Sequence, residues 1–328
     1  MKIMIVGGTG FLGFHALLEA LKRGHKVDAL AIDDVVLGDW YPGEVNVQYA
    51  DVFELTEANL RERFTGYDSM IYAVGPDDRI TPPAPAYEFF HTRLVDAVVK
   101  VAGAARKADV KKFVLLNSYF AYFDRIWPEK KLSKHHPYIK CRVEQAEQVI
   151  SAGESDMAVM VLELPYIFGS MPNRIPLWKD VLLDRFTKGS TIFFPKGGTN
   201  MIAAEHVGEA IIGALENGEH GVRYTVGDEN HSFNEMLEMM MAAIGANKKI
   251  KNIPGFMAII AGTIIERDFK KKGLEGGLDA RFLMRDIMTS NLFYDASQAA
   301  EKLGYKRGGL KEAIVKTMKA CYPEKFMD

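Results

Sequence analysis

Residues 1–13 read MKIMIVGGTGFLG, and this stretch decides the fold that the sequence predicts. The apolar run 3–6 is typical of a buried parallel strand, and the glycine turn after it leads into an amphipathic segment at 11–23. Glycine adopts the positive φ of such a turn without strain and lets the backbone approach a ligand closely. The free N–H groups and the dipole of the new helix favour a pyrophosphate. A G-x-G-x-x-G spacing between a strand and a helix therefore predicts a dinucleotide site.

Composition and charge narrow the classes of function. The chain has 328 residues, enough for two domains, and its net charge of −2 gives no bulk attraction for nucleic acid. Cys141 and Cys321 are its only cysteines, too few for a disulfide framework, which favours a reducing compartment. No signal-peptide pattern opens the chain, so we expect a cytoplasmic protein. Residues 253–265 are apolar but too short to span a bilayer, so we expect a buried helix there and no membrane partner.

Strand and helix patterns alternate along the first half of the chain, as in a parallel sheet with helices on both faces. Further strands are expected at 26–32, 45–49, 69–74, 112–116 and 157–164. Helices are expected at 55–64, 87–107 and 138–152. After residue 169 the alternation loosens. A helix over 207–216 and a strand over 222–226 then return to the sheet, and the remainder is mainly helical.

These patterns predict an α/β fold, a Rossmann-type doubly wound parallel sheet with a smaller, mainly helical C-terminal lobe for the substrate. We expect the dinucleotide-binding domain to comprise residues 1–169, with 202–226 returning to it. The substrate lobe would then comprise residues 170–201 and 227–328.

The loop after the second expected strand bears on which dinucleotide binds. Asp33 lies twenty residues beyond Gly13, where an acidic residue commonly binds the ribose 2′-hydroxyl of NAD and repels the 2′-phosphate of NADP. Asp34 and Asp39 are also acidic, and no Lys or Arg occurs between Asp33 and residue 43. These residues favour NAD, and the alternative is a loop whose carboxylates are only solvated.

A serine, a tyrosine and an arginine follow the fifth expected strand. Ser118 stands at the end of that strand, Tyr138 opens the next helix, and Arg142 lies one turn further. Residues i and i+4 share a helix face, so the side chains of Tyr138 and Arg142 should project together. A neighbouring cation favours the phenolate and lowers the pKa of the phenol. Such a tyrosine can exchange a proton with a substrate oxygen, held also by Ser118, while hydride moves to or from nicotinamide.

On these motifs the sequence resembles the extended short-chain dehydrogenases/reductases, the NAD-dependent epimerase/dehydratase family, over nearly its whole length. GGTGFLG at 7–13 is similar to the cofactor loop of that family, and residues 138–142 are similar to its YxxxK motif, with Ser118 at the serine position. Residues 164–169 resemble its RPxxxYG segment, and 295–305 resemble a common C-terminal segment. The resemblance implies cofactor contacts from Gly7, Gly10, Phe11, Leu12, Gly13, Asp33, Asp51, Val52, Ala73, Val74, Gly75 and Pro165.

Three departures from the family pattern bear on activity and substrate. Arg142 replaces a lysine that, in the family, holds the nicotinamide ribose and lowers the tyrosine pKa. Arginine keeps the charge but is planar and cannot release a proton. The cofactor-selecting position is shifted, because Ala31 and Ile32 precede Asp33. Residues 199–201 read TNM where nucleotide-sugar members carry an RDF-like segment, which argues against a nucleotide-sugar substrate. The sequence as a whole is more similar to dihydroflavonol-reductase-like and atypical members.

We therefore expect an NAD(P)-dependent reductase or dehydrogenase that prefers NAD and acts on the carbonyl or alcohol of a small apolar or aromatic molecule. Arg142 keeps open a non-catalytic NAD(P)-binding regulatory protein. An epimerase or dehydratase that uses the same site is a further alternative. The following aromatic residues either line an apolar substrate pocket or belong to the core: Phe120, Tyr122, Phe123, Trp127, Tyr166 and Trp178.

Partners other than the substrate are few in this interpretation. His135 and His136 lack an accompanying Cys or carboxylate cluster, so no metal is expected. No nucleic-acid partner is expected from the charge. The family resemblance implies a homodimer in which the helices at 87–107 and 138–152 pair with their copies.

Overall fold

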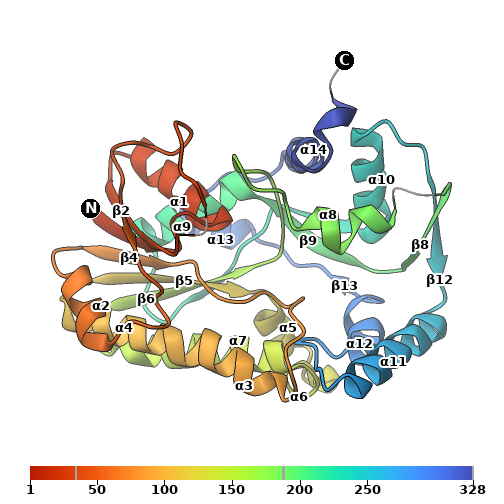
Figure 1. The fold of residues 1–328 in the computed structure, drawn as a ribbon, viewed down its shortest axis with the longest axis horizontal. Coiled ribbons are helices and arrows are strands. Elements are labelled where there is room, and N and C mark those ends of the chain that lie inside the picture. The colour runs from red at the N-terminus through yellow and green to blue at the C-terminus, as the bar shows by residue number, and fades with distance from the viewer. Residues whose placement is uncertain (34, 187–188, 327–328) are drawn as a thin grey trace.

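The computed structural model describes residues 1–328 except 34, 187–188 and 327–328. Its centre is a seven-stranded sheet in which every neighbouring pair is parallel, in the order β10-β6-β5-β4-β1-β2-β3 (Figure 1). The strands are β1 (Lys2–Val6), β2 (Lys26–Ala31), β3 (Asn46–Tyr49), β4 (Ser69–Tyr72), β5 (Lys112–Ser118), β6 (Ala158–Leu164) and β10 (Arg223–Thr225). The strand order reverses between β1 and β4, and ligands bind at such a switch point in open α/β sheets.

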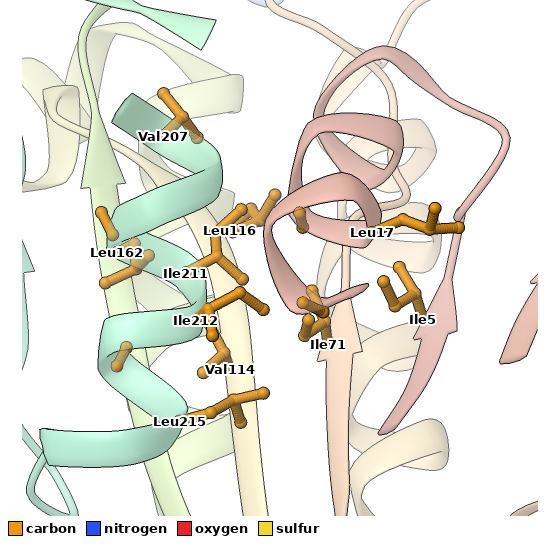
Figure 2. Close-up of a cluster of buried hydrophobic side chains, with 14 of the residues drawn as sticks. Ile5, Leu17, Ile71, Val114, Leu116, Leu162, Val207, Ile211, Ile212 and Leu215 are labelled. Atoms are coloured by element: carbon orange, nitrogen blue, oxygen red, sulfur yellow. The ribbon is translucent and has the colours of Figure 1, made fainter. Parts of the chain in front are cut away.

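Helices cover both faces of this sheet (Figure 1). One face carries α1 (Phe11–Lys22), α9 (Ala204–Asn217) and α13 (Ser297–Leu303). The other carries α2 (Glu57–Phe64), α4 (Ala97–Lys107) and α7 (Pro137–Gly153). A helical stretch leads into α4 through α3 (Ala86–Phe90) and a π-helical turn at His91–Asp96. Figure 2 shows the core on the first face, where α1 and α9 bury branched aliphatic side chains against the central strands, among them Ile5, Val114 and Leu162.

A smaller lobe stands beyond the carboxyl edge of the sheet. Its four-stranded sheet joins β7 (Tyr166–Phe168), β9 (Gly198–Ala203), β11 (Glu229–Ser232) and β13 (Asn291–Leu292), and β8 (Thr191–Pro195) pairs with β12 (Lys249–Ile253). The longer helices of the lobe are α10 (Phe233–Ala243), α11 (Gly255–Lys271) and α14 (Leu310–Cys321). Short helices connect the parts: α5 (Phe120–Ile126), α6 (Leu132–His135), α8 (Trp178–Val181) and α12 (Ala280–Phe282).

The predicted fold class is confirmed, because the sheet is parallel, doubly wound and followed by a mainly helical C-terminal portion. The prediction of a buried helix at 253–265 is wrong. A helix forms there, but Phe256, Ile260 and Ile264 are 66%, 55% and 60% exposed. Only its small residues, Ala258 and Gly262, are buried. Among the described residues, no helix is long and apolar enough to cross a membrane.

Candidate active site

The glycine loop after β1 is closed by contacts that exclude side chains. Gly7 has φ +88°, and its N–H donates to the Leu30 carbonyl at 2.7 Å. The Gly10 N–H donates to the Gly7 carbonyl at 3.0 Å. A Cβ on Gly13 would lie 2.1 Å from that same carbonyl oxygen, so α1 packs directly on the turn. The predicted reasons for these glycines, a left-handed turn and a close helix approach, are therefore observed.

The start of α1 presents a polar cradle above this loop. Gly10 precedes the helix and provides no side-chain cap, so the first N–H groups, at Phe11, Leu12 and Gly13, have no intrahelical acceptor. The side chains of Phe11 and Leu12 are half-buried. Free N–H groups, the helix dipole and a surface without Cβ atoms fit the pyrophosphate of a dinucleotide.

The end of β4 forms the other wall of the loop. The Ala73 N–H donates to the Val6 carbonyl at 2.9 Å, and the Ala73 carbonyl oxygen would lie 2.8 Å from a Cβ on Gly7. Gly75 has φ +141°, and a Cβ there would lie 2.7 Å from the Leu94 side chain. Residues 73–75 are thus held against the glycine loop, as expected for a segment that contacts the same ligand.

The remaining predicted cofactor residues follow the carboxyl ends of three other strands. Asp33 is exposed beyond β2, and Asp34 lies outside the described residues. Asp51 follows β3 and accepts the Phe53 N–H at 2.9 Å, whereas Val52 is buried. Pro165 is buried between β6 and β7. All of them lie toward the edge at which the glycine loop sits.

Tyr138 and Arg142 are joined on one face of α7. The Arg142 Nε–H donates to the Tyr138 phenol oxygen at 2.9 Å, and its guanidinium also lies over the phenol ring, 5.0 Å from the ring centre. The Arg142 Nη1 donates to the Leu116 carbonyl at 3.2 Å, which ties α7 to the end of β5. One strand, β4, separates β5 from β1. The pair therefore stands on the same sheet edge as the glycine loop.

Arg142 acts to lower the pKa of Tyr138 as expected, but the net shift of that pKa is upward. Tyr138 is 5% exposed, and burial raises the pKa of its phenol above the ordinary value. Arg142 opposes this shift, and Asp78 and Asp77 add to it. Because burial outweighs the single cation, the resting side chain is a neutral phenol whose conjugate base Arg142 can stabilise.

Two amides that the sequence analysis did not identify hold the arginine in place. Gln145 Oε1 accepts from Arg142 Nη1 at 2.8 Å, while Gln145 Nε2 donates to the Leu94 carbonyl at 2.8 Å. Asn117 Nδ2 donates to the Arg142 carbonyl at 2.9 Å and to Gln145 Oε1 at 3.2 Å. Gln145 lies three residues after Arg142 on the same helix face, which is the signal that could have identified it.

Ser118 ends β5 and is 8% exposed. Its hydroxyl oxygen accepts the Phe120 N–H at 3.3 Å, and its own N–H donates to Asn117 Oδ1 at 2.6 Å. In the described part of the chain no hydrogen bond joins Ser118 to Tyr138, so the two hydroxyls are independent groups at this edge. The proton of the serine hydroxyl remains available to a ligand.

A carboxylate on the proline-rich loop after β4 faces the tyrosines. Burial raises the pKa of Asp78 to about 6, and the Asp78 charge in turn raises the pKa values of Tyr138, Tyr119 and Tyr166. Its neighbour Asp77 is instead ion-paired with Arg79. The sequence analysis did not identify Asp78 as a residue near the candidate site.

All six aromatic residues that could line a pocket belong to, or pack against, buried hydrophobic clusters. Phe120 and Phe123 are 4% and 0% exposed and belong to the core around Tyr138. Tyr166 is half-buried and packs against Trp178 with ring centres 5.3 Å apart.

The two neighbouring histidines make packing and hydrogen-bond contacts. His135 stacks on Phe282, and His136 Nδ1 accepts the Asp279 N–H at 3.0 Å. These contacts are structural.

The sequence is similar to a known family model and to several known proteins. Residues 7–167 match the model of a family described as NAD(P)H-binding. A putative dihydroflavonol 4-reductase of Synechocystis is 20% identical over 94% of this chain and 91% of its own length. The mouse sterol-4-alpha-carboxylate 3-dehydrogenase, decarboxylating, is 24% identical over 67% of this chain and 59% of its own length.

Solved structures share the fold over the whole chain. A nucleoside-diphosphate-sugar epimerase from Pseudomonas aeruginosa has a TM-score of 0.71 at 16% identity, covering 100% of this chain and 99% of its own. UDP-glucuronic acid 4-epimerase from Bacillus cereus, in complex with NAD, has a TM-score of 0.68 at 14% identity, covering 99% and 100%. Residues 7–167 thus match the model of the NAD(P)H-binding family, and the whole chain shares the fold of these two epimerases.

Proposed function

We propose that this chain is an NAD(P)-dependent oxidoreductase that reduces the carbonyl, or oxidises the alcohol, of a small apolar or aromatic substrate. The observation that carries the proposal is the 2.9 Å hydrogen bond from Arg142 Nε to the Tyr138 phenol, on the sheet edge that also holds the glycine loop. A bound nicotinamide would supply or accept the hydride. Residues 170–201 and 227–328, apart from α13 on the main sheet, would form the lobe that encloses the substrate.

Each proposed catalytic group has a defined task. In the reducing direction the neutral Tyr138 phenol donates its proton to the substrate oxygen, and Arg142 stabilises the phenolate that remains. Ser118 donates its free hydroxyl proton to the same oxygen and orients it. Gln145 and Asn117 fix the guanidinium, so they are positioning residues rather than catalytic ones.

NAD is the proposed cofactor, held by residues 7–13 and 73–75, with Asp33 on the adenosine ribose. The exposed Asp33 carboxylate can accept a hydrogen bond from a 2′-hydroxyl and would repel a 2′-phosphate. Calorimetric titration with NAD and NADP tests this preference. Tighter binding of NADP would contradict it.

The substrate class rests on what lies at the site. Thr199 and Asn200 are fully buried in β9, with Tyr119 bonded to Thr199 and Asn230 bonded to Asn200. The segment at which sugar-nucleotide members carry an arginine is therefore a packed strand in this chain. Half-buried Tyr166 and Trp178 beside it favour an apolar ligand.

The direct test is Tyr138→Phe, assayed with a carbonyl substrate found by screening in the presence of NADH. Loss of the phenol proton should lower kcat by about 10²-fold or more, while calorimetry finds NADH affinity unchanged. Tyr87→Phe is the matched control, because its hydroxyl bonds Glu144 on the neighbouring helix and should not affect turnover. Full activity of Tyr138→Phe would overturn the proposed mechanism.

Arg142 motivates the second candidate, a non-catalytic NAD(P)-binding regulatory protein. If the chain binds cofactor but turns over no carbonyl, Arg142→Lys discriminates, since a gain of turnover indicates a decayed enzyme. An epimerase or dehydratase would instead convert its substrate without net consumption of NADH. That outcome keeps Tyr138 as the proton-transfer group and changes only the reaction.

A further inference from the structure

In helix α11 small residues are buried and large apolar side chains are exposed. Its inner face consists of the small residues Ala258 and Gly262, and a Cβ on Gly262 would lie 2.4 Å from the Ala280 carbonyl oxygen. The backbone of α11 therefore sits directly against α12. Ile259 and Phe269 are half-buried, but the other large apolar side chains of the helix are exposed. Burying them would stabilise a helix that served only the core.

The outward side chains form a continuous stripe. Five apolar residues of α11 are between 40% and 66% exposed: Phe256, Met257, Ile260, Ile264 and Ile265. Positions 256, 260 and 264 are four residues apart and so follow one line along the helix. Exposed apolar residues grouped in this way mark an interaction surface, unlike apolar residues scattered singly. We define these five residues as the α11 stripe.

Cations continue the stripe at its C-terminal end. Arg267 and Lys271 fall on the same helical line as Ile260 and Ile264, and both are exposed. Lys270 is exposed beside them. The acidic side chains of this helix are already engaged, since Asp268 pairs with Lys272 at 2.6 Å and Glu266 accepts the Ala280 N–H. The free charge bordering the stripe is therefore positive.

The charge pattern decides between the possible occupants. A second copy paired through α11 in the parallel sense would place Arg267 and Lys271 against themselves. In the antiparallel sense these residues would approach the end that follows exposed Lys251. Either arrangement opposes like charges, which disfavours self-association. An anionic surface that also accepts large apolar side chains satisfies both parts of the face.

We propose that α11 docks this protein onto an anionic lipid bilayer, with the stripe inserted between head groups and Arg267, Lys270 and Lys271 on lipid phosphates. An apolar outer face bordered by Arg267, Lys270 and Lys271 is the pattern of an interfacial helix. This 17-residue helix is not long and apolar enough to cross a bilayer, so in the proposal it lies in the membrane plane. The inference does not depend on the reaction that the protein catalyses.

Docking at α11 would also bring the active site to the membrane. Gly277, between α11 and α12, accepts the Tyr138 N–H at 2.9 Å, and a Cβ on it would lie 3.1 Å from the Tyr138 Cβ. Figure 1 places α11 and α12 at the rim of the lobe that faces away from α1. An apolar substrate dissolved in the bilayer would then enter beside the catalytic tyrosine.

The experiment is sedimentation of the full chain with vesicles of phosphatidylcholine alone, and with vesicles of equal parts phosphatidylcholine and phosphatidylglycerol. We expect binding to the anionic vesicles. Ile260→Gln/Ile264→Gln should weaken it at least about tenfold. Arg267→Gln/Lys271→Gln should weaken it about tenfold or more on anionic vesicles only. The matched control is Ile175→Gln/Leu177→Gln, which changes residues of 62% and 59% exposure outside α11 and should bind as the wild type.

Three outcomes would overturn the proposal. The first is wild-type protein that stays in the supernatant with both vesicle types. The second is a stripe variant that still binds like the wild type. The third is a wild-type dimer in analytical ultracentrifugation that becomes monomeric in the stripe variant without vesicle binding, which would assign the stripe to self-association. Circular dichroism of each variant confirms that the surface substitutions leave the fold intact.

Discussion

Replacing Asp78 by asparagine should stabilise the protein, and only above acidic pH. Asp78 is half-buried on the loop after β4, and burial raises its pKa from 3.8 to about 6. Asp77 adds to the shift, while Arg79 and Arg142 oppose it. At about 1.4 kcal/mol for a tenfold change in proton affinity, ionised Asp78 destabilises the folded state by about 3 kcal/mol.

The sign follows from proton linkage. Between pH 3.8 and about 6 the folded chain holds a proton on Asp78 that the unfolded chain has released. The wild type therefore loses this stability as the pH rises through that window, and the loss is complete above the folded-state pKa. Asp78→Asn removes the effect. Its free energy of unfolding should match that of the wild type at about pH 3.5 and exceed it by about 3 kcal/mol at about pH 7.5.

Urea unfolding of the cofactor-free chain, measured across this pH range, is the assay. Asp77→Asn serves as the control of opposite sign. Burial alone would raise the pKa of Asp77, but its pairing with Arg79 outweighs this and lowers it. That variant should lose stability at neutral pH. Equal stability of Asp78→Asn and wild type at neutral pH, or a difference independent of pH, would refute the assignment of a desolvated carboxylate beside Tyr138.

Two further predictions concern the loop and the core. Gly13→Ala places a Cβ 2.1 Å from the Gly7 carbonyl oxygen. Calorimetry should therefore show that NADH binding is lost, and urea unfolding should show a destabilisation of about 1–3 kcal/mol. The control Gly103→Ala, where a Cβ meets nothing within 4 Å, should change neither quantity. Arg125→Met leaves the carboxylate of Glu163 without its charged partner. Glu163 is 0% exposed and accepts two hydrogen bonds from Arg125, at 2.6 and 2.8 Å. The free energy of unfolding should fall by about 3 kcal/mol. Arg106→Met should cost under about 1 kcal/mol, because the acidic partners of Arg106, Glu154 and Asp156, are 58% and 65% exposed. Equal losses would contradict the buried-pair assignment.

The sheet was predictable because each of its signals is local. An apolar run, a glycine turn and an amphipathic helix are encoded within thirteen residues, and their repetition along the chain fixes a parallel sheet. The proximity of Tyr138 and Arg142 was predictable for the same reason, since four residues on a helix fix their spacing. Their chemistry was not. The net pKa of Tyr138 depends on burial by segments distant in sequence, such as the Gly277 turn and Phe90.

The prediction of a buried helix at residues 253–265 was wrong for a related reason. Hydrophobic periodicity identifies a helix and its apolar residues, but it does not say which face meets the protein. Here the small side chains of Ala258 and Gly262 let the backbone approach Ala280, and that contact turns the large side chains outward. The order of residue sizes around the helix, rather than its mean hydropathy, was the signal for an exposed apolar face.

Arg142 determines how far the family chemistry extends to this chain. A lysine at its place could reach a ribose hydroxyl and pass on a proton, whereas the guanidinium is committed to Tyr138, Leu116 and Gln145 and keeps its charge. It can stabilise the phenolate but cannot relay a proton to solvent. In the proposed mechanism, the proton for each turnover would therefore reach Tyr138 through another group. Asp78, whose charge is felt at Tyr138 and whose pKa is about 6, is the titratable side chain suited to that step.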